Sequence, residues 1–314
     1  MTLIWNLVLL VIGMVVLIKG ADFFVEGASA IATKFKIPQI IIGLTIVAFG
    51  TSAPEAAVSI SAAIRGTGGI AVGNILGSNI LNILLILGVT ACIRKMKVQE
   101  STFKFEIPFM LLVTGVLFAL GTGMQVLNKI CGVVLWALFI VFLVYLFRQA
   151  KNGSEDEEVL ANIGHKKSLP VLILVTLIGL AAIVWGSDLT VDGATGVAKM
   201  LGMSDRLIGL TIVAFGTSLP ELLTSITAAR KGNSDIAIGN IVGSNIFNIL
   251  FVLGTTSLIV NVPYGAEYLV DGIICIVAVL LLILCIWRKK ELNRKGGITM
   301  LVAFACYFAY LMVK

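Results

Sequence analysis

Charged residues are scarce in this sequence. They make up 13% of its 314 residues, whereas ordinary soluble domains contain about 25%. A soluble chain of this length would have to cover most of its surface with polar groups, so the scarcity excludes a soluble domain. Hydrophobic residues make up 59% of the chain, and ten transmembrane helices of roughly 20 residues each would take about 200 positions and leave about 110 for connections. The composition therefore predicts a membrane protein with short loops.

Histidine and clustered cysteine are also lacking. His165 is the one histidine, and the five cysteines stand singly in apolar runs, without CxxC or similar spacing. This pattern does not support a zinc site or a disulfide framework. Catalytic patterns such as HExxH and GxSxG are missing too, so we expect neither an enzyme nor a bound cofactor.

Ten apolar stretches, bounded by charged residues or by Gly/Pro clusters, predict ten transmembrane helices. No basic segment precedes the first stretch, so we interpret it as a retained span and not as a signal peptide. The expected ranges are 3–32, 38–63, 70–92, 105–122, 127–147, 169–199, 206–229, 236–260, 267–287 and 297–313. The sequence thus predicts an all-α polytopic membrane protein.

Basic residues are distributed unevenly over the connections between these helices. Of the 23 lysines and arginines, 17 follow helices 1, 3, 5, 7 and 9, and 5 lie on the other side. Because basic loops face the cytoplasm, both termini are expected outside and the loop between helices 5 and 6 inside, in a multi-pass cell-membrane protein. Since the same loops account for the net charge of +6, we expect no nucleic-acid partner, and nothing indicates an obligatory protein partner.

Residues 43–88 and 209–254 repeat one another. At a constant offset of 166 residues, 31 of the 46 positions are identical, including Gly, Thr, Ser, Pro, Glu and Asn. We therefore expect two five-helix units, 1–150 and 169–314, joined by an acidic, solvated linker at 151–168. Because five is odd, the second unit enters the membrane from the opposite side. Inverted repeats with broken helices near the midplane are typical of secondary transporters.

Each repeat places the motif GTSxPE halfway along a predicted span. Proline has no backbone N–H, so Pro54 and Pro220 each remove the helical donor for the carbonyl four residues earlier. We expect both helices to break at membrane depth and to free carbonyl groups from Ala48 to Thr51 and from Ala214 to Thr217. Hydroxyl groups lie in the same motif at Thr51, Ser52, Thr217 and Ser218.

A second motif, GNIxGSNIxN, follows in each repeat. It places Ser78 with Asn82, and Ser244 with Asn248, four residues apart on one helical face. Its glycines have the spacing that lets transmembrane helices pack closely. The asparagines could form hydrogen bonds between helices or bind an ion, and we favour ion binding because they recur beside acidic residues.

Glu55 and Glu221 are the central candidates for ion binding. A carboxylate at the bilayer centre is costly unless it finds a partner, and such residues mark ion or proton pathways. The repeats offer no basic partner within the membrane, so two acids brought together by symmetry would share a proton or a cation. Oxygen ligands suit Ca²⁺, Mg²⁺ or Na⁺. We predict a Ca²⁺ site formed by these two acids and the carbonyls of Thr51 and Thr217.

The two motifs, occurring twice in inverted halves of a ten-helix chain, resemble the cation/Ca²⁺ exchanger superfamily, specifically its prokaryotic Na⁺/Ca²⁺ exchangers. The resemblance implies electrogenic antiport of about three Na⁺ for one Ca²⁺, by alternating access in which helices 1 and 6 slide against the other eight. The partners it implies are these ions and the lipid bilayer. The cation-binding positions it implies are Glu55, Glu221, Thr51, Thr217, Ser52, Ser218, Ser78, Ser244, Asn82, Asn248, Ala48 and Ala214.

One position separates this chain from part of that superfamily. K⁺-dependent members of the superfamily carry Asp at the position of Asn248 in this chain. Because this chain has an amide there, we expect K⁺-independent exchange. The H⁺/Ca²⁺ branch has GNxxE in place of GTSxPE, which favours Na⁺ as the counter-ion here. The alternatives are an H⁺-coupled or K⁺-coupled antiporter of the same fold, and a passive cation channel, because broken helices and acids also build pores.

Overall fold

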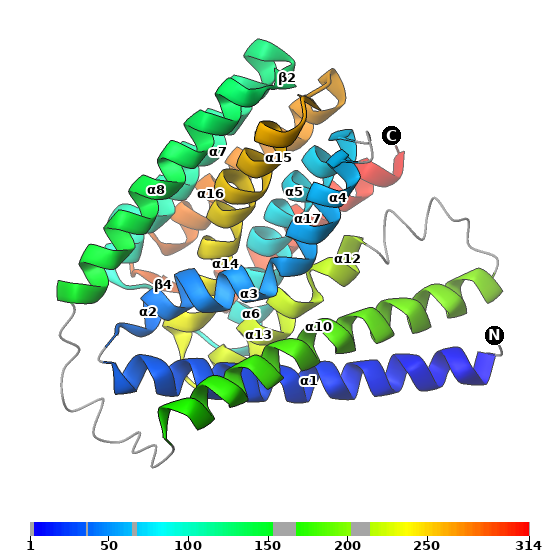
Figure 1. Cartoon of the computed structure of the whole chain (residues 1–314), viewed down its shortest axis with the longest axis vertical. Helices are drawn as coiled ribbons and strands as arrows, with labels where there is room; N and C mark the ends of the chain where they lie inside the picture. The colour runs from blue at the N-terminus through cyan, green and yellow to red at the C-terminus, as the bar shows by residue number, and fades with distance from the viewer. Residues whose placement is uncertain (1–2, 36, 65–67, 153–167, 202–213, 314) are drawn as a thin grey trace.

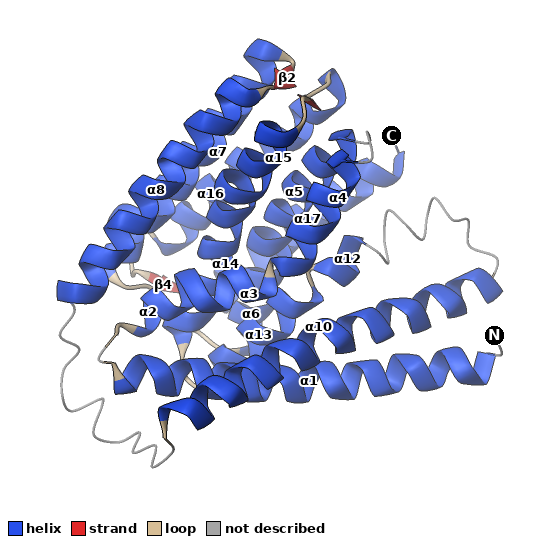
Figure 2. Ribbon diagram, in the orientation of Figure 1, coloured by secondary structure: helices blue, strands red, loops and turns tan. Residues whose placement is uncertain are grey.

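Helices form nearly all of the described chain. The computed structural model describes residues 3–35, 37–64, 68–152, 168–201 and 214–313. Strands occur there only as short segments, which Figure 2 shows in red between blue helices. The prediction of an all-α protein is therefore confirmed.

Two long helices, α1 (Leu3–Lys34) and α10 (Leu169–Met200), run side by side along one face of the molecule (Figure 1). They are antiparallel, and glycines spaced by seven residues line their contact. A Cβ added to Gly186 would lie 2.5 Å from the backbone nitrogen of Leu17. The missing side chains thus let the two backbones approach closely, as in other packed transmembrane helices. These glycines are Gly13, Gly20, Gly27, Gly179, Gly186 and Gly193.

The second predicted span is a broken helix. It consists of α2 (Gln39–Ile42), the π-helical η1 (Gly43–Val47), α3 (Ala48–Thr51) and α4 (Ala53–Ile64). The chain bends by 49° between the segments before and after Ser52. In the second repeat, Ser218 interrupts the helix in the same way, between α12 (Ala214–Thr217) and α13 (Leu219–Arg230). Both predicted breaks are therefore present.

Two helical rods form the interior of the molecule. The first comprises α5 (Gly68–Leu81), the π-helical η2 (Asn82–Leu87) and α6 (Gly88–Ile93). The second comprises α14 (Ser234–Phe247), the π-helical η5 (Asn248–Leu253) and α15 (Gly254–Ile259). Both rods are largely buried, and the π segments begin at equivalent asparagines of the two repeats.

The remaining helices pack around these interior helices. In the first repeat they are the π-helical η3 (Thr102–Glu106), α7 (Ile107–Met124) and α8 (Lys129–Asn152). In the second they are the 3₁₀ turn η6 (Ala266–Tyr268), α16 (Leu269–Ile286) and α17 (Arg294–Val313). These helices keep many apolar side chains exposed, as expected where a helix faces lipid. Of these, α7, α8 and α16 lie on the side away from α1 and α10 (Figure 1).

Short strand pairs show how the repeats are related. In the first repeat, β1 (Met96–Lys97) and β2 (Val126–Leu127) lie at opposite ends of α7. In the second, β3 (Val262–Pro263) and β4 (Glu291–Leu292) lie at opposite ends of α16. β1 pairs with β4, and β2 with β3, so each strand meets the non-equivalent strand of the other repeat. This pairing requires the two repeats to run through the molecule in opposite orientations.

The predicted spans coincide closely with the described helices. Among the described residues, 7 helices are long and apolar enough to cross a membrane, and the bent pair at Ser52 makes 8. Of the other two predicted spans, 206–229 begins outside the described residues, and 297–313 lies within the 20-residue helix α17. The predicted linker 151–168 falls mostly outside the described part of the chain.

Substituting Gly186 by Ala should separate α1 from α10. The added Cβ would meet backbone at 2.5 Å, so we expect the free energy of unfolding to fall by about 1–3 kcal/mol, measured as a lower Tm in detergent. Gly115→Ala in α7 is the matched control because nothing lies within 4 Å of its Cβ. Equal Tm values for the two variants would contradict close backbone packing at Gly186.

Candidate cation site

The two broken helices place an acid just after each break. Ser52 has φ −84° and ψ 6°, and Ser218 has φ −93° and ψ 4°, so each leaves the helical conformation one residue before the next segment begins. Glu55 and Glu221 then lie in the first turn of α4 and α13. The amino-terminal end of a helix carries positive partial charge, which favours a carboxylate there. Both acids are nevertheless almost fully buried, at 1% and 0% exposure.

Hydrogen bonds cross between the repeats at these breaks. Ser52 Oγ donates to Glu221 Oε1 at 2.8 Å, and Ser218 Oγ donates to Glu55 Oε1 at 3.2 Å. Each break therefore orients the acid of the other repeat and brings the two carboxyl groups into one region. Thr217 and Thr51 lie against the Glu55 and Glu221 carboxyl groups respectively.

Asparagines of the interior rods complete this region. Asn82 Nδ2 donates to Asn245 Oδ1 at 3.0 Å, and Asn248 Nδ2 donates to Asn79 Oδ1 at 3.1 Å. Asn79 and Asn245 also donate to one another's backbone carbonyls, at 3.2 and 3.3 Å. Asn245 and Asn79 thus bind the amide nitrogens of the predicted ligands Asn82 and Asn248. The amide oxygens of Asn82 and Asn248 remain available.

Four buried oxygens of this region have no hydrogen-bond partner among the described residues. An unpartnered buried oxygen is costly, and most such groups in folded proteins are satisfied. Two of the four come from carboxylates, and the set is symmetric between the repeats, as a cation shared by both repeats would require. The oxygens are Glu55 Oε2, Glu221 Oε2, Asn82 Oδ1 and Asn248 Oδ1.

The other predicted residues surround the acids in different ways. Ser218 Oγ lies 3.5 Å from Ser78 Oγ, which places Ser78 beside Glu55. Thr51 Oγ1 donates to Asn240 Oδ1 at 3.0 Å, and Ser244 Oγ donates to the Ala48 carbonyl at 3.4 Å. Ala214 begins α12, and the residues before it lie outside the described part.

The expectation that the Ala48 carbonyl is free was wrong. The proline at position 54 was expected to free the carbonyls from Ala48 to Thr51. However, the Ala48 oxygen still accepts a helical hydrogen bond from the Ser52 N–H at 3.0 Å, as well as contacts from two hydroxyl groups. The helix breaks only at Ser52, so the Ala48 carbonyl keeps its helical donor.

Sequence reasoning missed the residues that position the ligands. Besides Asn79 and Asn245, Asn240 donates to the Glu221 carbonyl at 3.3 Å and to Ser225 Oγ at 2.9 Å. In the first repeat the equivalent Asn74 donates to Ser59 Oγ at 3.0 Å. The signal was present, because all four asparagines are identical between the repeats within the motif GNIxGSNIxN.

Basic side chains do not reach the acids in the described part of the chain, where the recorded ion pairs lie at the ends of helices or in loops. Lys231, for example, lies at the end of α13, where its Nζ is 3.5 Å from Asp22 Oδ1 and donates to the Asp22 carbonyl at 2.8 Å. Groups of three or more His, Cys, Asp or Glu side chains are also absent from the described residues. The candidate site therefore combines two acids with neutral oxygen atoms.

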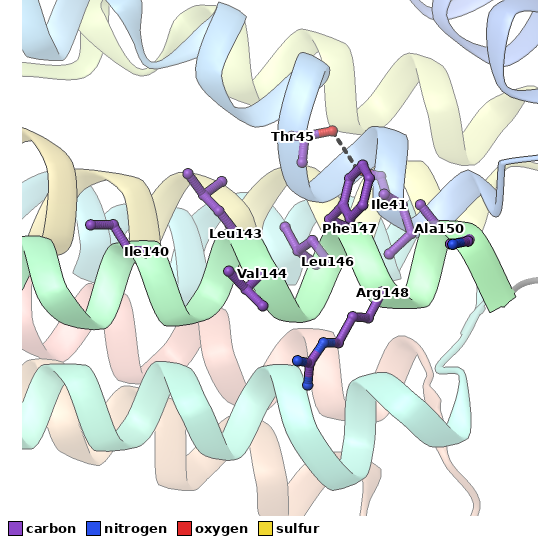
Figure 3. Close-up of a pocket in the computed structure, with 10 residues that line it drawn as sticks. Ile41, Thr45, Ile140, Leu143, Val144, Leu146, Phe147, Arg148 and Ala150 are labelled. Carbon is purple, nitrogen blue, oxygen red and sulfur yellow. Dashed lines mark hydrogen bonds between the residues drawn. The ribbon is translucent and has the colours of Figure 1, made fainter.

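A cavity of about 690 Å³ lies elsewhere, between the first broken helix and α8. Figure 3 shows Ile41 and Thr45 on one side of it and Leu143 and Phe147 of α8 on the other. Thr45 Oγ1 donates to the Ile41 carbonyl at 2.6 Å, so its hydroxyl is already used. The lining contains no carboxylate, so this cavity does not have the chemistry of a cation site.

Inverted repeats that meet in broken helices around buried acids define a membrane transporter by class. The family model for "Sodium/calcium exchanger protein" matches residues 5–148 and 171–313. The chain therefore belongs to the sodium/calcium exchanger family, which is a family of antiporters and not of enzymes.

Individual relatives agree with this assignment. The inner membrane protein YrbG of Escherichia coli is 38% identical over 314 residues, covering 96% of this chain and 95% of that protein. The sodium/calcium exchanger MaX1 of Methanosarcina acetivorans is 32% identical over 351 residues, 98% of each chain. A solved structure of the sodium-calcium exchanger NCX_Mj, without Na⁺ and Ca²⁺, matches with a TM-score of 0.85 and 35% identity over 99% of this chain and 100% of that chain.

Removing the supporting amides should weaken the site without abolishing it. Residues that orient metal ligands typically contribute 10- to 100-fold to affinity, so Asn79→Ala and Asn245→Ala should each raise the Kd for Ca²⁺ by about tenfold or more. Calorimetric titration of the purified protein measures this. Asn128→Ala is the control, since Asn128 caps α8 by accepting from the Ile130 N–H at 2.9 Å, far along the chain from the site motifs. An unchanged Kd in both site variants would contradict the positioning role.

Proposed function

We propose that this chain is an electrogenic antiporter that exchanges about three Na⁺ for one Ca²⁺ at a site centred on Glu55 and Glu221. The observation that carries this proposal is the set of four buried, unpartnered oxygens contributed equally by the two repeats. Membership of the sodium/calcium exchanger family supports the choice of ions.

Charge and ligand type favour Ca²⁺ as the divalent ion. Two carboxylates balance its two charges, and Ca²⁺ accepts six to eight oxygens in flexible geometry. The acids, the amide oxygens of Asn82 and Asn248, and the carbonyls of Thr51 and Thr217 supply such a set. Na⁺ ions distributed over the same oxygens and the nearby hydroxyls of Ser78 and Ser244 would compete with it. The remaining positions proposed as ligands are Ser52, Ser218, Ala48 and Ala214.

Alternating access would proceed by sliding of α1 and α10 against the rest of the bundle. These helices pack on each other through glycines along their whole length, which supports their motion as one body. They lie against the broken helices that hold the acids, so their displacement would expose the site first to one side and then to the other.

Orientation in the membrane follows from the basic loops. We propose a cell-membrane protein with both termini outside, units 1–150 and 169–314, and a cytoplasmic linker at 151–168. Exchange of three Na⁺ for one Ca²⁺ moves one net charge, worth about 2.3 kcal/mol per 100 mV. A negative interior would therefore assist Ca²⁺ extrusion.

Neutralising either acid should stop exchange. Glu55→Gln and Glu221→Gln each leave one carboxylate for a divalent ion, so ⁴⁵Ca²⁺ uptake into Na⁺-loaded proteoliposomes should fall to background. Glu100→Gln is the control because Glu100 is paired outside the site, with Lys104 and Lys290. Uptake that persists in both site variants, or that needs no Na⁺ gradient in the wild type, would contradict the proposal, and the second result would indicate a channel.

Potassium should not be required. Asn248 supplies an amide where a third carboxylate would be needed to balance an additional cation, so replacing external choline by K⁺ should leave the rate of Na⁺-driven ⁴⁵Ca²⁺ uptake unchanged. Asn248→Asp adds that charge, and K⁺ should then alter the rate. A strict K⁺ requirement in the wild type would refute this part of the proposal.

A further inference from the structure

A second buried carboxyl group lies outside the site described above. Glu106 ends the π-helical η3 and is 0% exposed. Tyr145 of α8 donates a hydrogen bond to its Oε1 at 2.6 Å. Thr102, four residues earlier in η3, and Gln149, four residues after Tyr145, also face this carboxyl group. Four oxygen-bearing side chains from two helices therefore converge.

Three oxygens of this cluster lie near one another but have no partner in good hydrogen-bond geometry among the described residues. They are Glu106 Oε2, Thr102 Oγ1 and Gln149 Oε1, and all three atoms are buried. Thr102 as a whole is 0% exposed. Burying an oxygen without a partner is unfavourable, so this cluster requires either a shared proton or a bound cation to satisfy its oxygens. The central cation site has the same property.

The local backbone supports a binding role. Short π-helical segments occur frequently at functional sites. In the described part of the chain, the π-helical segments η1, η2 and η5 belong to the helices that build the central site. The remaining described π-helical segment, η3, lies outside that site and carries Thr102 and Glu106.

Aromatic side chains fix the cluster on one side. The ring of Tyr145 stacks on Phe105 with centroids 3.7 Å apart and an interplanar angle of 22°. Phe142 lies next to it, with ring centroids 6.5 Å apart. This packing holds the phenol oxygen against Glu106 and keeps the surroundings apolar, where an unbalanced charge would be costly.

We propose that Glu106, Thr102, Tyr145 and Gln149 form a second cation site, which binds one alkali cation. One carboxylate balances one positive charge, whereas a divalent ion would leave a net charge in apolar surroundings. The hydroxyl, phenol and amide oxygens are hard, neutral ligands of the kind that such ions prefer. The site is independent of the proposed exchange, because it shares no residue with the central site.

The second repeat provides a matched comparison. Helix α17 begins 165 positions after α8, and at this offset Asp271 and Tyr310 correspond to Glu106 and Tyr145. Tyr307 donates to Asp271 Oδ1 at 2.9 Å, so an acid paired with tyrosine recurs. However, the positions of Thr102 and Gln149 are taken by Glu267 and Lys314. The neutral ligands of the first cluster are thus not repeated.

Thermal unfolding of the full-length protein tests this site. The background is the double variant Glu55→Gln with Glu221→Gln, in detergent and a Ca²⁺ chelator, with NaCl replacing choline chloride at constant ionic strength. Ligands that bind the folded state raise its Tm, so Tm should rise to saturation with NaCl. KCl and LiCl series identify the preferred ion. Adding Glu106→Gln should remove the rise, and Thr102→Val should shift its midpoint by about tenfold.

One control variant and one alternative background make the outcome decisive. Asp271→Asn in the same background should retain the rise, because its cluster lacks the threonine and the glutamine. If the double variant does not fold, the comparison is made in the otherwise wild-type chain, where Glu106→Gln should remove one of two Na⁺-dependent components. A Tm that does not depend on Na⁺, K⁺ or Li⁺, or an equal rise with and without Glu106, would overturn the proposal and leave a protonated carboxyl group there. Failure of the central site would instead appear as Ca²⁺ binding that survives in the Glu55 and Glu221 variants.

Discussion

Two carboxylates buried at membrane depth without a basic partner are the constraint on which this structure depends. Glu55 and Glu221 are almost completely shielded from solvent, and the hydrogen bonds that reach them satisfy one oxygen of each. A charge in such surroundings must be balanced, and the described residues contribute no lysine or arginine to do so. The fold brings the acids together from both repeats, which makes a shared cation the simplest way to satisfy them.

The inverted repeat explains how one chain can build such a site. Ser52 donates to Glu221 while Ser218 donates to Glu55, and Asn79 and Asn245 donate to one another's carbonyls, so reciprocal hydrogen bonds join the two repeats. The strand pairs β1–β4 and β2–β3 also join one repeat to the other, at the two ends of the bundle. A site constructed in this way would present nearly the same oxygens to both sides of the membrane, as the proposed alternating access requires.

Much of this arrangement could be predicted from the sequence. The scarcity of charge indicated the membrane, the repeat indicated inversion, and Pro54 and Pro220 indicated the helix breaks, all because these signals are local or periodic. The bonding of Asn79 and Asn245 could not be predicted, since it depends on which faces of two separate rods meet. The Ala48 carbonyl was wrongly expected to be free, because Pro54 removes the helical donor only for the Gly50 carbonyl, whereas the donor for Ala48 is the Ser52 N–H. The Glu106 cluster was also missed, because its residues lie on two helices and form no motif.

The central claim is that both acids bind the same divalent ion. The measurement that tests it most directly is anomalous diffraction from crystals of the protein soaked in Ca²⁺. We expect one Ca²⁺ peak about 2.3–2.6 Å from carboxylate oxygens of both Glu55 and Glu221. A peak that contacts only one of the two acids, or a Ca²⁺ ion bound elsewhere while this region stays empty, would contradict the account.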